Sequence, residues 1–177
     1  MTRTTTRSVA FALAALTLAA CGGGDTDGTT HNAADVTFAQ AMIPHHQQAV
    51  EMAELALDRA SSEDVRALAE QIRAAQAPEI ATLTDWLDTW DEDTAPAATE
   101  DHAGHTMPGL GELNDATGPA FDTAFLELMI EHHRGAVEMA RTERTEGAYE
   151  PATSMAESII TSQTAEIDRM TTLLPPD

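Results

Sequence analysis

Apolar and small residues recur at intervals of three and four along most of the chain, which is the pattern of amphipathic helices. Polar residues and prolines interrupt this pattern at a few points, and Gly147 ends one of the stretches. Because the connection inside each pair of stretches is short, each pair predicts an antiparallel helical hairpin. The four helices are expected at residues 35–59, 63–90, 118–146 and 151–174.

The second hairpin repeats the first. FAQAMIPHHQQAVEMA begins at Phe38 and FLELMIEHHRGAVEMA begins at Phe125, so equivalent residues lie 87 positions apart. Such a repeat indicates a duplicated structural unit. The match continues beyond this block, because five further residues of the first copy recur in the second: Glu70, Ile72, Gln76, Glu79 and Ile80.

The segment 91–117 between the repeats is acidic and rich in Pro, Gly, Ala and Thr, so it is expected to be a long crossover. The fold predicted from these patterns is all-α. It is a four-helix bundle over residues 35–174, made from repeat one (35–90), the linker (91–117) and repeat two (118–174).

The first twenty residues are typical of an export signal. Arg3 and Arg7 precede an apolar run at 9–20 that is too short to span a bilayer as a mature helix. The run ends LAAC, which resembles the lipobox of bacterial lipoproteins, so residues 1–20 predict a signal peptide and Cys21 a lipidated residue. Residues 21–34 are then expected to form a flexible tether. We expect an exported lipoprotein in the cell membrane or outer membrane, facing periplasm or exterior; the alternative is an ordinary signal peptide with a chance cysteine.

The chain is strongly acidic, with 30 Asp and Glu residues against 9 Lys and Arg and a formal charge of -21. Such a surface repels nucleic acid, so no nucleic-acid partner is expected. The acidity has two compatible explanations. The first is solubility or the base composition of the genome, and the second is that the negative charge concentrates cations near the ligands. Since Cys21 is the only cysteine, disulfides within the chain and thiolate metal cages are excluded.

The repeated block places soft metal donors on one helix face. With 100° per residue, Met42, His45, His46 and Met52 fall within one sector, and a donor three or four residues from another can share its ion. Met52 lies two turns away from His45, so complete coordination needs the other repeat or the linker. The candidate ligands are Met42, His45, His46, Met52, Met129, His132, His133 and Met139.

Thioether sulfur and imidazole without cysteine favour Cu(I), with Ag(I) as its mimic, whereas imidazole-rich edges suit Cu(II). The linker repeats this chemistry at His102, His105 and Met107. Two His-His pairs in register favour metal binding over the plainer explanation, in which methionines and histidines are core residues. For the linker cluster alone, ligation and chance composition stay open.

The duplicated MIxHHxxAVEMA block resembles the bacterial family named domain of unknown function 305, over about residues 35–174. The resemblance implies a ferritin-like four-helix bundle. It also implies copper binding of the kind found in the CopM-type periplasmic members. Family members often carry another Met after the linker's MPG, where this chain has Leu110.

Three functions follow as hypotheses. The first is an envelope protein that binds copper for sequestration, tolerance or delivery without catalysing a reaction. The second is a ferritin-like di-iron or di-manganese oxidase, which expects Glu-x-x-His pairs that the chain lacks. The third is a metal-free interaction bundle. We recognise no catalytic constellation and expect no enzyme; a homodimer and a metal donor or acceptor protein stay open as partners.

Overall fold

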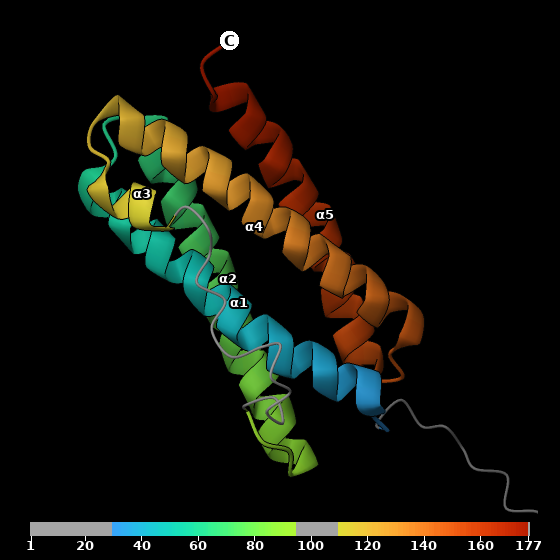
Figure 1. The fold of residues 1–177 in the computed structure, drawn as a ribbon. Coiled ribbons are helices and arrows are strands. Elements are labelled where there is room, and N and C mark those ends of the chain that lie inside the picture. Colours follow the sequence, from blue (N-terminus) through green and yellow to red (C-terminus); the bar gives the residue numbers. More distant parts are fainter. Residues whose placement is uncertain (1–29, 95–109, 177) are drawn as a thin grey trace, which may run out of the picture.

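The computed structural model describes residues 30–94 and 110–176, which contain helices and no strand. Helix α1 (Ala33–Arg59) packs along α2 (Glu63–Trp90), and α4 (Pro119–Glu146) packs along α5 (Glu150–Leu173). The two hairpins meet through α1 and α4, with the start of α1 beside the end of α4 (Figure 1). The predicted all-α fold is therefore confirmed.

The starts of α1, α4 and α5 and the end of α5 differ from the predicted ones by one or two residues. Helix α1 begins at Ala33 because Asn32 is its N-cap, and the side chain of Asn32 accepts hydrogen bonds from the backbone of Ala34 and Asp35. Asp35, the predicted start, is the third helical residue, and its carboxylate accepts from the backbone nitrogen of Asn32, which completes a capping box. Helix α5 begins at Glu150, since a proline is favoured inside the first turn.

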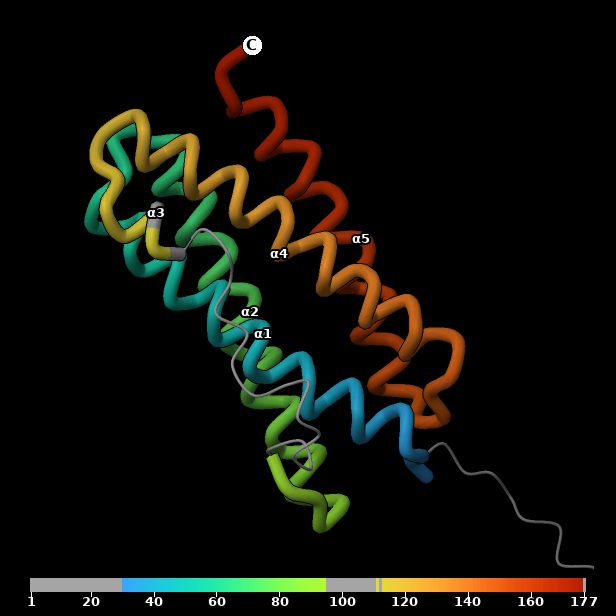
Figure 2. Tube along the Cα trace, viewed as in Figure 1, coloured from blue at the N-terminus to red at the C-terminus, as the bar shows by residue number. Residues whose placement is uncertain are grey.

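The predicted crossover contains a short helix, α3 (Leu110–Asp115), that the sequence pattern did not indicate. The side chain of Leu113 is fully buried, and Arg59 donates a hydrogen bond to the carbonyl oxygen of Asn114. These contacts hold α3 against the end of α1 and the start of α4 (Figure 2). The predicted ligands His102, His105 and Met107 lie outside the described residues, as do Cys21 and the predicted signal peptide. No helix in the described part of the chain is long and apolar enough to cross a membrane.

In each hairpin, an aspartate near the start of the first helix accepts hydrogen bonds from the turn of the other hairpin. Asp35 of α1 accepts hydrogen bonds from the backbone nitrogens of Ala148 and Tyr149 in the α4–α5 turn. Asp122 of α4, its equivalent in the repeat, accepts from the backbone nitrogens of Ser61 and Ser62 in the α1–α2 turn. The duplication is therefore visible as a pseudo-twofold relation between the hairpins.

The core has two apolar clusters, each built from all four long helices. The first surrounds Phe121 and Phe125, and the second surrounds Phe38 and Leu83. On every long helix, the residues of one cluster are separated from those of the other by a short stretch that contains polar side chains. A polar layer thus crosses the middle of the bundle.

Candidate metal centre

The polar layer is formed by equivalent residues of the two repeats, two from each long helix. Most of these side chains are buried, although layers of this kind are rare in small helical cores because unpaired polar groups destabilise them. Its members are His45 and His46 on α1, Gln76 and Glu79 on α2, His132 and His133 on α4, and Gln163 and Glu166 on α5.

Each repeat contains one histidine bonded to a glutamate across its hairpin. The distance from His46 Nε2 to Glu79 Oε2 is 2.8 Å, and the distance from His133 Nε2 to Glu166 Oε2 is 2.6 Å. A carboxylate only accepts, so Nε2 of each ring carries the hydrogen, and in the neutral ring Nδ1 carries the lone pair. Nδ1 of His46 and of His133 is buried and has no hydrogen-bond partner among the described residues. Each of these nitrogens therefore has a lone pair that no hydrogen bond within the described structure uses.

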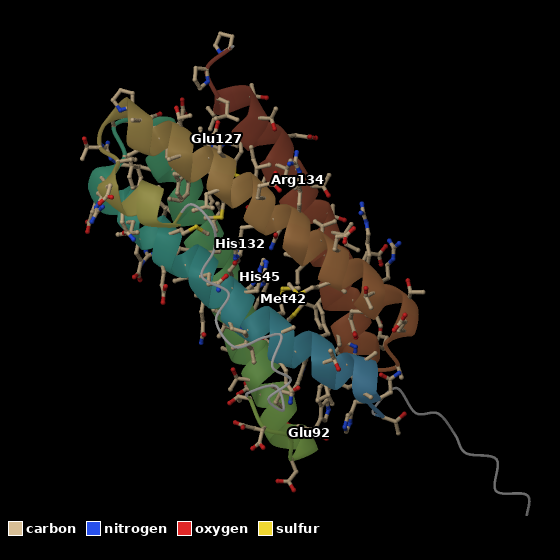
Figure 3. The ribbon with its side chains drawn as sticks, in the orientation of Figure 1. Met42, His45, Glu92, Glu127, His132 and Arg134 are labelled. Carbon is tan, nitrogen blue, oxygen red and sulfur yellow. The ribbon has the colours of Figure 1, made fainter. Side chains whose placement is uncertain are left out.

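The other two histidines meet where α1 crosses α4 (Figure 3). The ring centroids of His45 and His132 lie 3.6 Å apart, and His132 Nε2 donates to the carbonyl oxygen of His45 at 2.8 Å. Burial, followed by the nearby His45 and His133, lowers the pKa of His132 to about 2. His132 is therefore neutral at physiological pH, with its buried Nδ1 unpaired within the described structure.

The methionines lie on both sides of this layer. Met42, Met52 and Met129 are fully buried, whereas Met139 is partly exposed. Met42 and Met139 belong to the Phe38 cluster, and Met52 and Met129 belong to the Phe125 cluster. Each cluster thus contains the first methionine of one repeat and the second methionine of the other, as the spacing argument requires if the repeats are to share ions.

The donor set fits a soft cation. Buried imidazole nitrogens without partners lie in a layer that is bordered on both sides by clusters containing methionines, and the buried amides of Gln76 and Gln163 also have unpaired atoms. An unpaired buried polar group typically costs about 1–3 kcal/mol, so the layer gains stability from anything that satisfies it. In the described ranges, no three His, Cys, Asp or Glu side chains gather closely enough to hold a metal ion without methionine.

The sequence predicted eight ligands in the two repeats, and the structure brings these side chains to the polar layer and its two borders. Their role as ligands stays a prediction. Sequence reasoning missed the glutamates as histidine partners and missed the buried glutamines. The available signal was their recurrence at the repeat spacing, which Glu79, Glu166, Gln76 and Gln163 all share.

Comparisons with known proteins agree with this fold. A putative secreted DUF305 protein of Streptomyces coelicolor is 35% identical, with a TM-score of 0.71, over 79% of this chain and 91% of that one. CopM in its Cu(I)-bound form is 35% identical, with a TM-score of 0.68, over 78% of this chain and 93% of CopM. CopM has also been solved in Cu(II)-bound and Ag-bound forms.

A DUF305 fragment from Deinococcus radiodurans is 27% identical, with a TM-score of 0.71, over 80% of this chain and 95% of the fragment. None of the curated proteins compared with the chain matches it. The family model described as domain of unknown function (DUF305) matches residues 35–174. The chain therefore belongs to the DUF305 family.

Proposed function

We propose that this protein binds copper, preferentially Cu(I), within the polar layer, and holds it for sequestration, tolerance or delivery in the cell envelope. The observation that carries the proposal is the set of buried, unpaired imidazole nitrogens between two pairs of methionines. The similarity to CopM, which has been solved with Cu(I), Cu(II) and Ag bound, supports the same choice of ion.

The chemistry of the layer suits a monovalent soft ion. Neutral imidazole and thioether donors bind Cu(I) without first releasing a proton, and His132 is already neutral. Glu79 and Glu166 hold their imidazoles in one orientation and bring negative charge one hydrogen bond away from the donor rings. Carboxylates in this position increase the basicity of ligating histidines.

Location and partners belong to the same proposal. The pattern of residues 1–20 with Cys21 supports an exported, lipidated protein, and a DUF305 neighbour is described as a putative secreted protein. The acidic surface would then attract cations in the envelope. A protein that donates copper to this chain or accepts it is the expected partner, and binding without turnover is the expected activity.

An anaerobic titration tests the proposal. The full chain with Cys21→Ser, which removes the only thiol, competes with a coloured chelator for Cu(I). We expect tight binding that falls by about 100-fold when both His46→Leu and His133→Leu are introduced, because each replacement deletes one donor. His31→Gln, which changes a histidine stacked on Trp90 outside the layer, should bind as the parent does. Equal binding by all three proteins would exclude the layer as the copper site.

Two glutamates near the histidines leave a ferritin-like oxidase as the alternative function. Glu79 and Glu166 each contact a histidine, and carboxylate and imidazole are the ligands of ferritin-like di-iron sites. Oxygen consumption with Fe(II) distinguishes the two functions. Rapid consumption that is lost in Glu79→Gln with Glu166→Gln would favour the oxidase, and no consumption above buffer would favour copper binding.

A further inference from the structure

The start of α1 and the end of α4 border a half-open cavity of about 380 Å³. Apolar and small side chains form most of its wall, and the exposed carboxylate of Glu146 adds negative charge. The lining residues that matter here are Thr37, Phe38 and Ala41 of α1, and Met139, Thr142 and Glu143 of α4.

The cavity opens onto a methionine of the candidate metal centre. Met139 lines the cavity and is partly exposed, whereas Met52, its equivalent in repeat one, is fully buried. Met139 also packs against the cluster that contains the buried Met42. Solvent therefore reaches this cluster at Met139, while Met42 stays buried.

The line of contact between α1 and α4, which we call the seam, leads from the cavity to the histidines. On α4, Met139, Gly135 and His132 are spaced by four and three residues, so they share one face and span about 10 Å along the axis. Gly135 allows the ring of His45 to approach α4 closely at this point, since a Cβ there would lie 3.2 Å from His45 Nε2. Figure 3 shows Met42 on α1 close to the point where His45 and His132 meet.

The equivalent seam at the other end of the α1–α4 pair is filled. Ala34 and Ala41, which line the cavity, correspond to Phe121 and Leu128 in the second repeat. Phe121 is fully buried, and Leu113 of α3 is buried in the same cluster. In that half, larger side chains occupy the region equivalent to the cavity. Figure 2 shows α3 lying there, close to the end of α1 and the start of α4.

We propose that Cu(I) enters and leaves the protein through this cavity by way of Met139, while α3 and Phe121 close the equivalent path in the other half. This inference rests on the proposed function, because it concerns the route to the same site. The acidic rim attracts cations, and an apolar wall with thioether sulfur favours a soft, weakly hydrated ion over hard ions.

Site-specific blocking tests the route. In the full chain with Cys21→Ser, Thr142→Cys places a single thiol at the cavity, and its equivalent Leu55→Cys places one in the filled half. Each protein is studied before and after coupling to a bulky maleimide. Stopped-flow transfer of Cu(I) from and to a coloured chelator gives the rates, and an equilibrium titration gives the affinity.

Coupling at Thr142→Cys should slow loading and release by about tenfold or more, with equilibrium affinity unchanged. Coupling at Leu55→Cys should change neither rate. Ala41→Phe, which narrows the cavity from α1 without a label, should also slow both rates. Equal rates with and without the label at Thr142→Cys, or equal slowing at both positions, would overturn the route. Failure of the unlabelled proteins to bind Cu(I) would instead overturn the proposed function and the route with it.

The exposure of Met139 to solvent can also be measured without copper. Dilute peroxide oxidises exposed methionines first, and mass spectrometry of peptides identifies the sulfoxides. Met139 should be oxidised well before Met52, and coupling at Thr142→Cys should protect it. Oxidation of Met52 as fast as Met139 would contradict the asymmetry between the two halves.

Discussion

His132 donates a hydrogen bond to the carbonyl oxygen of His45, its own equivalent in the first repeat, and the centroids of the two rings lie 3.6 Å apart with their planes tilted by 36°. The pseudo-twofold axis therefore passes close to a pair of imidazoles rather than through apolar packing. The neighbouring His46 and His133 bond to Glu79 and Glu166 on the outer helices. This arrangement makes the centre of the bundle polar.

Removing the charge of the two glutamates should weaken copper binding while preserving the fold. In Glu79→Gln with Glu166→Gln, the amide oxygen can still accept from Nε2, but the imidazoles lose the carboxylates that increase their basicity. We expect Cu(I) affinity to fall by about 10–100-fold in the competition titration, with unchanged helicity by circular dichroism. Glu70→Gln, a surface glutamate paired with Arg73, is the control and should bind normally. Unaltered affinity in the double variant would show that the carboxylates do not act on the ligands.

Gly135 should tolerate no branched side chain. A Cβ at this position would lie 3.2 Å from His45 Nε2, so the methyl groups of valine would enter the space of the imidazole. We expect Gly135→Val to lower the free energy of unfolding by about 1–3 kcal/mol, measured by chemical denaturation. Gly111→Val, where a Cβ meets nothing within 4 Å, should cost less. Similar losses in both variants would argue against a close approach of His45 to α4.

The carboxyl group of Glu143 should make stability depend on pH. Burial, and then the neighbouring carboxyl group of Asp35, raise the pKa of Glu143 to about 8, while backbone hydrogen bonds help to lower the pKa of Asp35. Between the unfolded value of 4.5 and about 8, the folded protein holds a proton that the unfolded chain releases. The free energy of unfolding should therefore fall as pH rises through this window, by at most about 5 kcal/mol.

Denaturation curves at pH 5 and pH 9 measure this effect. Glu143→Gln, which cannot ionise but keeps a donor toward Asp35, should flatten the profile between those values. The lowered pKa of Asp35 acts at lower pH, where its contribution is lost as pH falls below its unfolded value of 3.8. A parent protein equally stable at both pH values, or a variant with the parent's slope, would contradict the raised pKa of Glu143.

Leu113 should be the residue that holds α3 in place. Its side chain is fully buried, so Leu113→Ala should lower the free energy of unfolding by about 2–4 kcal/mol. Peroxide should then oxidise Met52 faster, because the filled half of the seam opens. Leu57→Ala, which trims a partly buried leucine of the same cluster, serves as the comparison and should leave Met52 slow to oxidise. Unchanged oxidation of Met52 in Leu113→Ala would mean that α3 does not shield it.

The long helices could be predicted from the sequence because their periodicity is strong and occurs twice. The bounds of α2 and the end of α1 agree with the expectation, since Ser62 and Arg59 lie at clear breaks in the pattern. The start of α1 was placed late because Asn32 and Asp35 are both good cap residues and a capping box uses both. The sequence did not indicate helix α3 because it is six residues long, too short for a helical repeat of apolar side chains. Leu113 is the large apolar side chain that the structure shows buried in it.

The candidate site was predictable only in part. Helical spacing brings donors of one helix to one face, but it does not indicate which residues of another helix lie opposite. The partners Glu79 and Glu166 could therefore be noticed as recurring residues and not as histidine partners. The difference between Met52 and Met139 could be indicated only in part, by the larger Phe121 and Leu128 at the positions of Ala34 and Ala41, because it also depends on where α3 packs.

The central claim is that Met and His side chains of both repeats hold copper in the polar layer. X-ray absorption at the copper edge of the Cu(I)-loaded full chain with Cys21→Ser tests it most directly, because it identifies the atoms around the metal. We predict a mixture of sulfur and nitrogen scatterers, with nitrogen reduced in the His46→Leu, His133→Leu variant. A spectrum with only oxygen and nitrogen neighbours, unchanged in that variant, would contradict the claim.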